Sequence, residues 1–254
     1  MSHQESYYKN NEAYAEHLAA WNPALYAKYA DSLKPDQPGA RVLDVGCGVG
    51  QVVARLNEAG FEAHGVDVSQ PNIDRAKEVC PRCELYDGKK LPFPDNYFTS
   101  AGALNVLEHV DEPEAFIRDV VRVVAPGGKV VLSSPNFFRV FGFRDYHPRM
   151  RGVGQKLRNW KRLREKRTQM QHAPDTVCFD RMQPIIKEPF TPDDDAIVAT
   201  NAAEMKFFLE RAGCLVSRVE CTDRYVAKPI DFLLNLGPWR YVMFNSFLVA
   251  KKMK

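Results

Sequence analysis

The feature that most constrains the fold is a regular alternation of short apolar strands and helical segments between residues 41 and 133. Each predicted strand is rich in β-branched or other apolar residues, and glycine or proline separates most of the elements. The predicted strands cover 41–46, 61–68, 83–86, 98–104 and 129–133, and the predicted helices cover 51–59, 71–79 and 112–125. This alternation indicates an α/β fold with a doubly wound, mostly parallel sheet and helices on both faces.

The remaining segments extend this core into one domain over residues 1–254. We expect a helical cap over 1–40, a segment without the strand–helix rhythm over 136–200, inserted after the fifth strand, and a final helix with two more strands over 201–254. The last two strands are predicted at 214–221 and 247–250, with an apolar connection over 222–244. The sheet therefore has seven strands.

Two predicted helices carry starting signals. Asp111 with Glu114 resembles a capping box ahead of the helix 112–125, and Asn201 with Glu204 marks the start of the last predicted helix. We expect both acidic residues to act at their own helix ends.

Composition excludes several classes of protein. With 254 residues, 45% hydrophobic and 26% charged, the chain can bury one sizeable core, unlike a disordered, collagen-like or disulfide-stapled chain. The N-terminal segment lacks an apolar signal core, and polar residues interrupt the apolar stretch 230–250, so we expect a cytoplasmic protein without a spanning helix. Its six cysteines are expected to be free thiols. Cys80 and Cys83 have metal-like spacing but no second pair, so no zinc site is predicted.

A glycine-rich loop follows the first strand at residues 43–50, LDVGCGVG. Glycines there let a ligand approach the backbone and the start of the next helix. Asp67 ends the second strand about twenty residues later, where a carboxylate accepts hydrogen bonds from ribose hydroxyls. Together they predict a cofactor that contains a nucleoside.

The charge of the loop indicates the kind of nucleoside cofactor. Asp44 precedes the first glycine, and Gln51 stands where a dinucleotide fingerprint has its third glycine. A carboxylate favours a cationic ligand over a pyrophosphate. Asp87 and Gly88, just after the third strand, can reach an adenine amino group from the same sheet edge.

These motifs resemble the class I S-adenosylmethionine-dependent methyltransferases, in the broad group that includes small-molecule and quinone-precursor enzymes. The resemblance runs from about residue 41 to 136 and implies a Rossmann-like fold. It rests on residues 43–50, 65–69, Asp87 ahead of 91–98, 106–110 and 125–128. The family implies S-adenosyl-L-methionine as the cofactor. Its predicted contacts are Asp44, Gly46, Cys47, Gly48, Asp67, Val68, Asp87, Gly88, Leu104 and Asn105.

Methyl transfer to a hydroxyl needs removal of its proton. His109, just beyond the fourth strand, is the first candidate base, although it can instead only order its loop. Tyr146 and His147 are secondary candidates. Glu108 with His109 is similar to a metal site of quinone-pathway O-methyltransferases, but Asn105 stands where that pattern has Glu, so we predict no metal.

A basic arm spans residues 139–167. It holds eleven Lys and Arg residues against two acidic residues, a net charge of +9 in a chain whose total is +3. One interpretation is a solvated helix whose apolar residues Leu157, Trp160 and Leu163 pack on the body. The others are a lid that grips an acidic acceptor, which the resemblance favours, a surface on anionic lipid, and an RNA contact.

The segment 225–244 is unusually apolar for a connection and includes Trp239 and Tyr241. Burial against the body is the common outcome for such a segment; a pocket wall, an oligomer contact and a shallow membrane patch are the alternatives.

The sequence as a whole predicts methyl transfer from S-adenosylmethionine to a small or lipid-linked molecule, with oxygen as the favoured acceptor atom. Two alternatives stay open. One is an RNA methyltransferase that uses the basic arm, and the other is a cofactor-binding partner subunit without turnover of its own.

Overall fold

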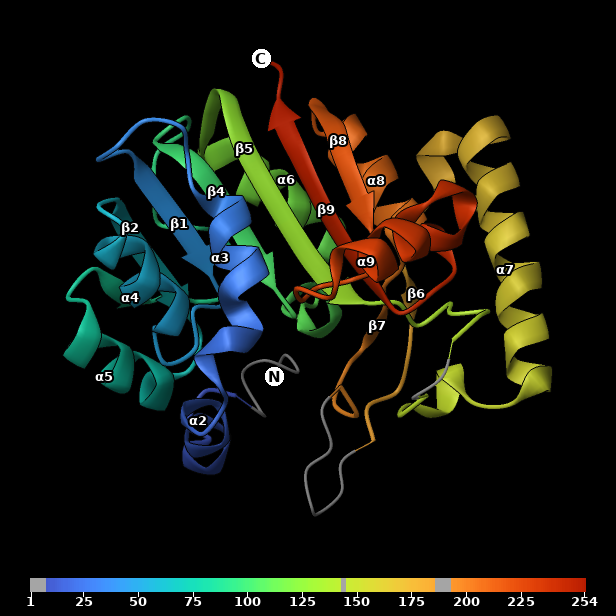
Figure 1. Cartoon of the computed structure of the whole chain (residues 1–254), viewed down its shortest axis with the longest axis horizontal. Coiled ribbons are helices and arrows are strands. Elements are labelled where there is room, and N and C mark those ends of the chain that lie inside the picture. The colour runs from blue at the N-terminus through green and yellow to red at the C-terminus, as the bar shows by residue number, and fades with distance from the viewer. Residues whose placement is uncertain (1–7, 143–144, 186–192) are drawn as a thin grey trace.

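The core of the computed structural model is one twisted seven-stranded sheet, and the structure describes residues 8–142, 145–185 and 193–254 (Figure 1). The spatial order is β3-β2-β1-β4-β5-β9-β8. All neighbouring pairs are parallel except those of β9, which is antiparallel to β5 and β8. The strands are β1 (Arg41–Val45), β2 (Glu62–Asp67), β3 (Cys83–Leu85), β4 (Phe98–Leu104), β5 (Val124–Pro135), β8 (Cys214–Glu220) and β9 (Asn245–Lys252). The predicted Rossmann-like, mostly parallel sheet is confirmed.

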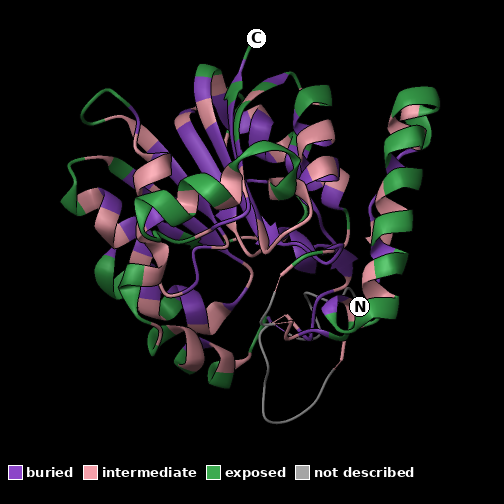
Figure 2. Ribbon diagram, turned by 45° about the vertical axis from the view of Figure 1, so that its right-hand side comes forward, coloured by how far each residue is buried: buried purple, intermediate pink, exposed green. Residues whose placement is uncertain are grey.

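Helices cover both faces of this sheet, and the strands lie between them as a buried layer (Figure 2). Successive residues of β1 show why: Val42 packs with one group of helices and Leu43 with the other, because side chains alternate along a strand. Helices α3, α4 and α5 cover the first face, and α6 and α8 cover the second. The helices are α2 (Glu12–Ala19), α3 (Ala27–Leu33), α4 (Gln51–Glu58), α5 (Gln70–Val79), α6 (Pro113–Val123), α7 (Val153–His172), α8 (Ala202–Arg211) and α9 (Lys228–Asn235).

The two helix-start predictions have different outcomes. Asn201 caps α8 as predicted, because its side chain accepts hydrogen bonds from the backbone N–H groups of Ala203 and Glu204. The capping box at α6 is wrong. The N-cap residue there is Glu112, which makes no side-chain cap, and Glu114 instead accepts from the backbone N–H of Phe179 at 2.8 Å.

The fifth strand is also longer than predicted. β5 begins at Val124, directly after α6, and continues through the glycine pair that was expected to separate helix from strand. Strand pairing with β4 is irregular at this point, which accommodates the glycines within the ladder.

The segment 136–200 leaves the sheet after β5, as predicted. It contains α7, which stands at one side of the molecule (Figure 1), and a two-stranded ribbon of β6 (Asp180–Arg181) and β7 (Val198–Ala199). Within the described ranges, no helix has the length and apolar character needed to cross a bilayer.

Candidate functional site

The site lies where the strand order reverses, since β1 has β2 on one side and β4 on the other. In parallel sheets this switch point leaves a crevice at the carboxyl ends of the strands. The glycine-rich loop between β1 and α4 fills its floor. The N–H groups of Gly46 and Cys47 donate to the Val66 carbonyl at 2.7 and 3.0 Å, so the loop is tied to the end of β2.

Gly46 shows why the loop needs glycine. Its φ is +73°, and a Cβ placed on it would lie 2.3 Å from Cγ2 of Val106. A side chain there would be strained and would collide with the segment after β4. Asn105 on that segment also has a positive φ, +53°, and donates its backbone N–H to the Ser133 carbonyl at 2.9 Å. Both bends keep the main chain close to the crevice.

Asp67 is the acidic residue at the end of β2. Its Oδ2 accepts from the Gly48 N–H at 2.9 Å, and its Oδ1 accepts from the Ser69 N–H at 2.9 Å and from the Asn72 amide at 3.2 Å. Burial raises the pKa of this carboxyl despite these donors. Oδ2 keeps a second lone pair, which suits a ligand hydroxyl.

Asp44, at the end of β1, lies beside the loop and is buried. Its Oδ1 accepts from the Tyr29 hydroxyl at 2.8 Å. Burial raises the pKa of Asp44 to about 7, and the nearby Asp67 adds to the shift. A cation beside the two carboxylates would relieve this electrostatic cost.

A cavity extends from these carboxylates toward His109. None of its described lining residues is lysine or arginine. A pyrophosphate would lack a cationic partner here, whereas a positively charged sulfonium would meet carboxylates. Of the predicted contact and base residues, the cavity is lined by Asp44, Gly46, Cys47, Gly48, Asp67, Val68, Leu104, Asn105 and His109.

Two predicted cofactor residues do not line the cavity. Asp87 is exposed and accepts from the backbone N–H groups of Lys89 and Lys90 at 2.9 and 3.3 Å, and Gly88 lies beside it. Tyr86, immediately before them, does line the cavity. An adenine contact from Asp87 and Gly88 stays a prediction.

The N-terminal cap closes one side of the cavity. Tyr14, His17 and Leu18 on α2, with Trp21 just after it, face the glycine loop. The Gln51 amide at the start of α4 donates to the carbonyls of Leu18 and Trp21 at 3.4 and 3.5 Å. The cap therefore shields the cavity from water.

His109 belongs to a buried polar network at the other end of the cavity. The Tyr8 hydroxyl lies 3.0 Å from His109 Nδ1 and donates a short hydrogen bond to Asp195. Asp195 Oδ2 is itself 3.7 Å from Nδ1. A histidine, a tyrosine and a carboxylate therefore meet at the cavity wall, in an arrangement that can accept and stabilise a proton.

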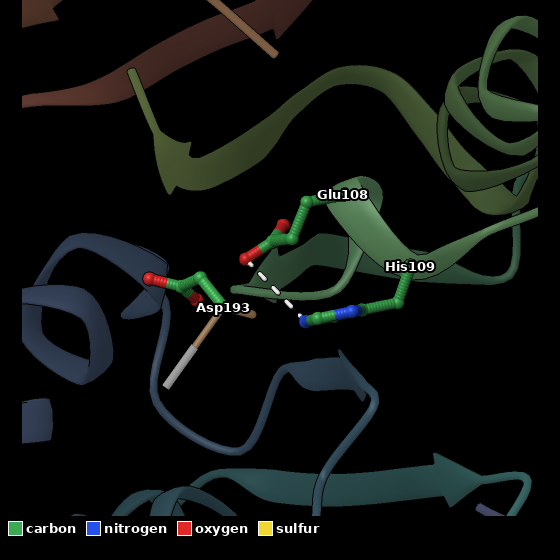
Figure 3. Close-up of side chains that lie close together, drawn as sticks. All are labelled: Glu108, His109 and Asp193. Atoms are coloured by element: carbon green, nitrogen blue, oxygen red, sulfur yellow. Dashed lines mark ion pairs between the residues drawn. The ribbon is translucent and has the colours of Figure 1, made fainter. Parts of the chain in front are cut away.

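Glu108 lies together with two residues of the cavity lining, His109 and Asp193 (Figure 3). Each offers one ligand atom, and these atoms lie within 4.8 Å of one another, so the three residues could hold a divalent cation. Other side chains already bond to the two carboxyls: Ser134 donates to Glu108 Oε2 at 2.8 Å, and Tyr146 hydrogen-bonds to Asp193, whereas the buried Glu108 Oε1 has no hydrogen-bond partner among the described residues. Burial raises the pKa of Asp193 to about 6 and raises that of Glu108 well above its ordinary value.

Sequence reasoning missed Asp193 and Asp195. Both line the cavity, although they come from the basic insertion. The run of three aspartates at 193–195, in a segment otherwise rich in lysine and arginine, was the available signal.

The two secondary base candidates lie outside the cavity lining. Tyr146 does not line the cavity but hydrogen-bonds to Asp193, which does, and burial raises the pKa of the Tyr146 hydroxyl. His147 is buried against Phe137, and its Nδ1 accepts from the Arg149 N–H at 3.2 Å. No described cation of the basic arm lines the cavity either, so a grip of the arm on the acceptor stays a prediction.

The fold and the cavity agree with a class I S-adenosylmethionine-dependent methyltransferase domain. Residues 43–132 match the family described as "Methyltransferase domain", and this match implies S-adenosyl-L-methionine as the cofactor. The crevice fits that cofactor, since its acidic residues and close-lying glycine backbone match a cationic nucleoside.

Comparisons with individual proteins give the same class. The chain is 33% identical over 107 residues to 2-methyl-6-phytyl-1,4-hydroquinone methyltransferase of Synechocystis sp., covering 39% of this chain and 33% of that protein. It is 31% identical over 132 residues to ubiquinone biosynthesis O-methyltransferase of Coxiella burnetii, covering 46% of this chain and 56% of that protein. It thus spans between a third and just over half of the length of these relatives.

Among solved structures, the fold is similar to that of an S-adenosylmethionine-dependent methyltransferase from Mesorhizobium loti. The TM-score is 0.58 at 19% identity, and the alignment covers 90% of this chain and 98% of that one. At this identity the likeness shows a shared fold.

Proposed function

We propose that this protein transfers the methyl group of S-adenosylmethionine to a hydroxyl oxygen of a small or lipid-linked acceptor. The observation that carries the proposal is the continuity of one cavity from Asp44 and Asp67 to His109. The acidic end suits the cofactor, and the other end offers the base that a hydroxyl nucleophile needs.

The chemistry requires little of the protein. Bound S-adenosylmethionine supplies a methyl group that is already electrophilic because its sulfur is positively charged. The chain must place the acceptor oxygen in line with that carbon and exclude water. As the hydroxyl oxygen gains the methyl group, His109 would take the hydroxyl proton. Tyr8 and Asp195 orient the imidazole and stabilise its charged form.

Two observations support an acceptor of this class. The acceptor end is walled by tyrosines, histidine and aspartates, which suit a phenolic or hydroxylated ring. The relatives' names include a hydroquinone methyltransferase and a ubiquinone biosynthesis O-methyltransferase. The cations that an RNA substrate needs lie on the arm, away from the cavity lining.

The test combines binding and turnover. Calorimetry with S-adenosylmethionine should show one site per chain, and a panel of phenols, catechols, quinols with isoprenoid tails and amines should give S-adenosylhomocysteine release with the hydroxylated members. Release only with amines would move the transfer to nitrogen, and release only with RNA would favour the RNA alternative. Binding without release across the panel would make the chain a cofactor-binding partner subunit.

A further inference from the structure

Exposed apolar side chains concentrate in two segments of the molecule. Among the described residues, fifteen large hydrophobic side chains are exposed, and eleven of them fall within 141–160 or 225–239. The eleven are Phe141, Val153, Leu157, Trp160, Tyr225, Val226, Ile230, Phe232, Leu233, Leu236 and Trp239. Scattered exposed apolar residues are ordinary, but a concentration of this kind marks an interaction surface.

Helix α7 presents three of its apolar residues outward. Its buried residues are polar: the Asn159 amide donates to the carbonyls of Phe137, Arg139 and Arg149, and Lys166 pairs with Glu204 at 2.8 Å. Polar contacts therefore anchor the inner face.

The outer face of α7 carries Val153, Leu157 and Trp160. Their spacing of four and three residues places them in one stripe along the helix. The prediction that Leu157 and Trp160 pack on the body is wrong, and only Leu163 of that set lies against the small core of the insertion.

The second segment connects β8 to β9 and holds α9 with the short helix η5 (Gly237–Tyr241). α9 has no buried residue, and its Phe232 and Leu233 are 66% and 64% exposed. The expectation that this connection is buried against the body is therefore wrong.

Packing joins the two segments. Phe141 of the first segment and Trp239 of the second meet edge to face, with ring centroids 5.6 Å apart. Within the first segment, Lys156 on α7 donates to the Gly142 carbonyl at 3.0 Å. Topology also places them together, since one segment follows the carboxyl end of β5 and the other follows β8, which runs parallel to β5. Both segments therefore begin at the sheet edge that holds the cavity, and α7 extends from there along the side of the molecule (Figure 1).

Exposed cations accompany the apolar side chains. Arg158, Lys161, Arg164 and Arg167 are exposed on α7, whose one acidic residue is Glu165. An exposed apolar stripe with tryptophan, flanked by lysine and arginine, is the pattern of a helix that lies in the interface of an anionic membrane. RNA would use the cations but leave the apolar residues unexplained, and a second copy would bring like charges together.

We propose that the surface formed by the outer face of α7, Phe141 and the α9–η5 connection docks on an anionic lipid bilayer. The apolar side chains enter the headgroup boundary, and the cations neutralise lipid phosphates. Docking at this edge brings the cavity near acceptors dissolved in the lipid, a consequence that rests on the proposed methyl transfer; the docking itself does not.

The test is flotation with vesicles of phosphatidylcholine alone and of phosphatidylcholine mixed with phosphatidylglycerol. We expect binding to the mixed vesicles, weakened at high salt, and at least a tenfold loss of affinity for Phe232→Ser/Leu233→Ser and for Leu157→Ser/Trp160→Ser. Lys161→Gln/Arg164→Gln should lose affinity for mixed vesicles and keep its residual binding to neutral ones.

The matched control is Leu215→Ser, on the opposite end of β8, whose side chain is 56% exposed. It should bind vesicles like the unmodified protein, and all variants should keep the calorimetric affinity for S-adenosylmethionine, which separates docking from the methyl-transfer site. Equal affinity of the unmodified protein and the three double variants for mixed vesicles would overturn the proposal. So would a dimer that the apolar variants dissociate without any change in vesicle binding, or RNA binding that only the charge variant loses.

Discussion

The two ends of the cavity are built in different ways. At the cofactor end, contacts are local in sequence: Asp67 meets Gly48, nineteen residues away, and the loop bonds to the neighbouring strand. At the acceptor end, Tyr8 contacts His109 and Asp195, which are 101 and 187 residues away. The first end follows from one strand–loop–helix unit, whereas the second exists only once the cap, the core and the insertion have come together.

Because the two ends are built from different residues, substitutions can affect cofactor binding and methyl transfer separately. Changes at the cofactor end should weaken affinity for S-adenosylmethionine, and changes at the acceptor end should slow transfer while leaving that affinity intact.

The largest expected effect is at Asp67. Replacing Asp67 with Ala removes the carboxylate that would accept from the ribose hydroxyls, so affinity for S-adenosylmethionine should fall by roughly 2 to 4 kcal/mol, the range for lost charge-assisted hydrogen bonds. Isothermal titration calorimetry measures this. Asp74→Ala, which removes an exposed carboxylate on α5, is the control.

Because Asp67 also accepts from Gly48, Ser69 and Asn72, its loss leaves buried donors unpaired. Thermal unfolding with and without ligand distinguishes a damaged loop from a lost ligand contact. Unchanged affinity in a folded Asp67→Ala variant would remove Asp67 from the ribose site.

The next effect is at His109. If its imidazole takes the acceptor proton, His109→Ala should reduce kcat about a hundredfold or more, with affinity for S-adenosylmethionine within about twofold of the unmodified protein. Single-turnover measurement of S-adenosylhomocysteine with the best acceptor from the panel gives the rate. His172→Ala, at the exposed end of α7, is the matched control.

Near-normal turnover in His109→Ala would reduce the residue to a role in ordering its loop. Tyr8→Phe sharpens the result, since it removes the hydroxyl between His109 and Asp195 and should slow transfer by about tenfold if that network holds the imidazole.

The same contrast explains how much the sequence could predict. Asp44, Gly46 and Asp67 follow strand ends within a regular alternation, so local pattern was enough to bring them to one crevice. Tyr146 and His147 were selected by residue type within the insertion, but among its described residues Asp193 and Asp195 line the cavity. No local pattern specifies which part of a long insertion folds back on the sheet.

The errors at element ends have a similar origin. Glu114 has the spacing of a capping residue, yet its carboxylate bonds to the backbone of Phe179, 65 residues later. Leu157 and Trp160 have the spacing of a buried stripe, yet Asn159 and Lys166 face the body because their polar groups find partners there. In both cases a contact with a residue distant in sequence decided where the side chain lies, and the spacing within the helix did not.

A smaller effect is expected from pH at the cofactor end. The pKa of Asp44 is about 7 in the ligand-free protein, so its carboxyl is mostly protonated below that pH. A proton and a cationic ligand compete for it, and affinity for S-adenosylmethionine should therefore fall about fivefold from pH 7 to pH 6 and level off above about pH 8. Calorimetry at each pH tests this, and Asp44→Asn should flatten the dependence.

The stability of the ligand-free protein should change in the opposite direction. The unfolded chain releases the Asp44 proton near pH 4, whereas the folded protein keeps it until about pH 7, so this residue makes the fold less stable as pH rises between those values. A pH-independent affinity in the unmodified protein would place the cationic part of the ligand away from Asp44.

The smallest expected effect is at the acceptor end, on removal of metal. Glu108, His109 and Asp193 have a spacing that suits a divalent cation. However, Ser134 and Tyr146 already bond to the two carboxyls, and burial raises the pKa of both carboxyls. A protonated Glu108 is a poor metal ligand, and a metal-bound His109 could not take a proton. Transfer rates should therefore change less than about twofold in EDTA. A loss of tenfold or more, restored by Mg²⁺ and absent in Asp193→Asn, would instead make these three residues a metal centre and would move the role of base away from His109.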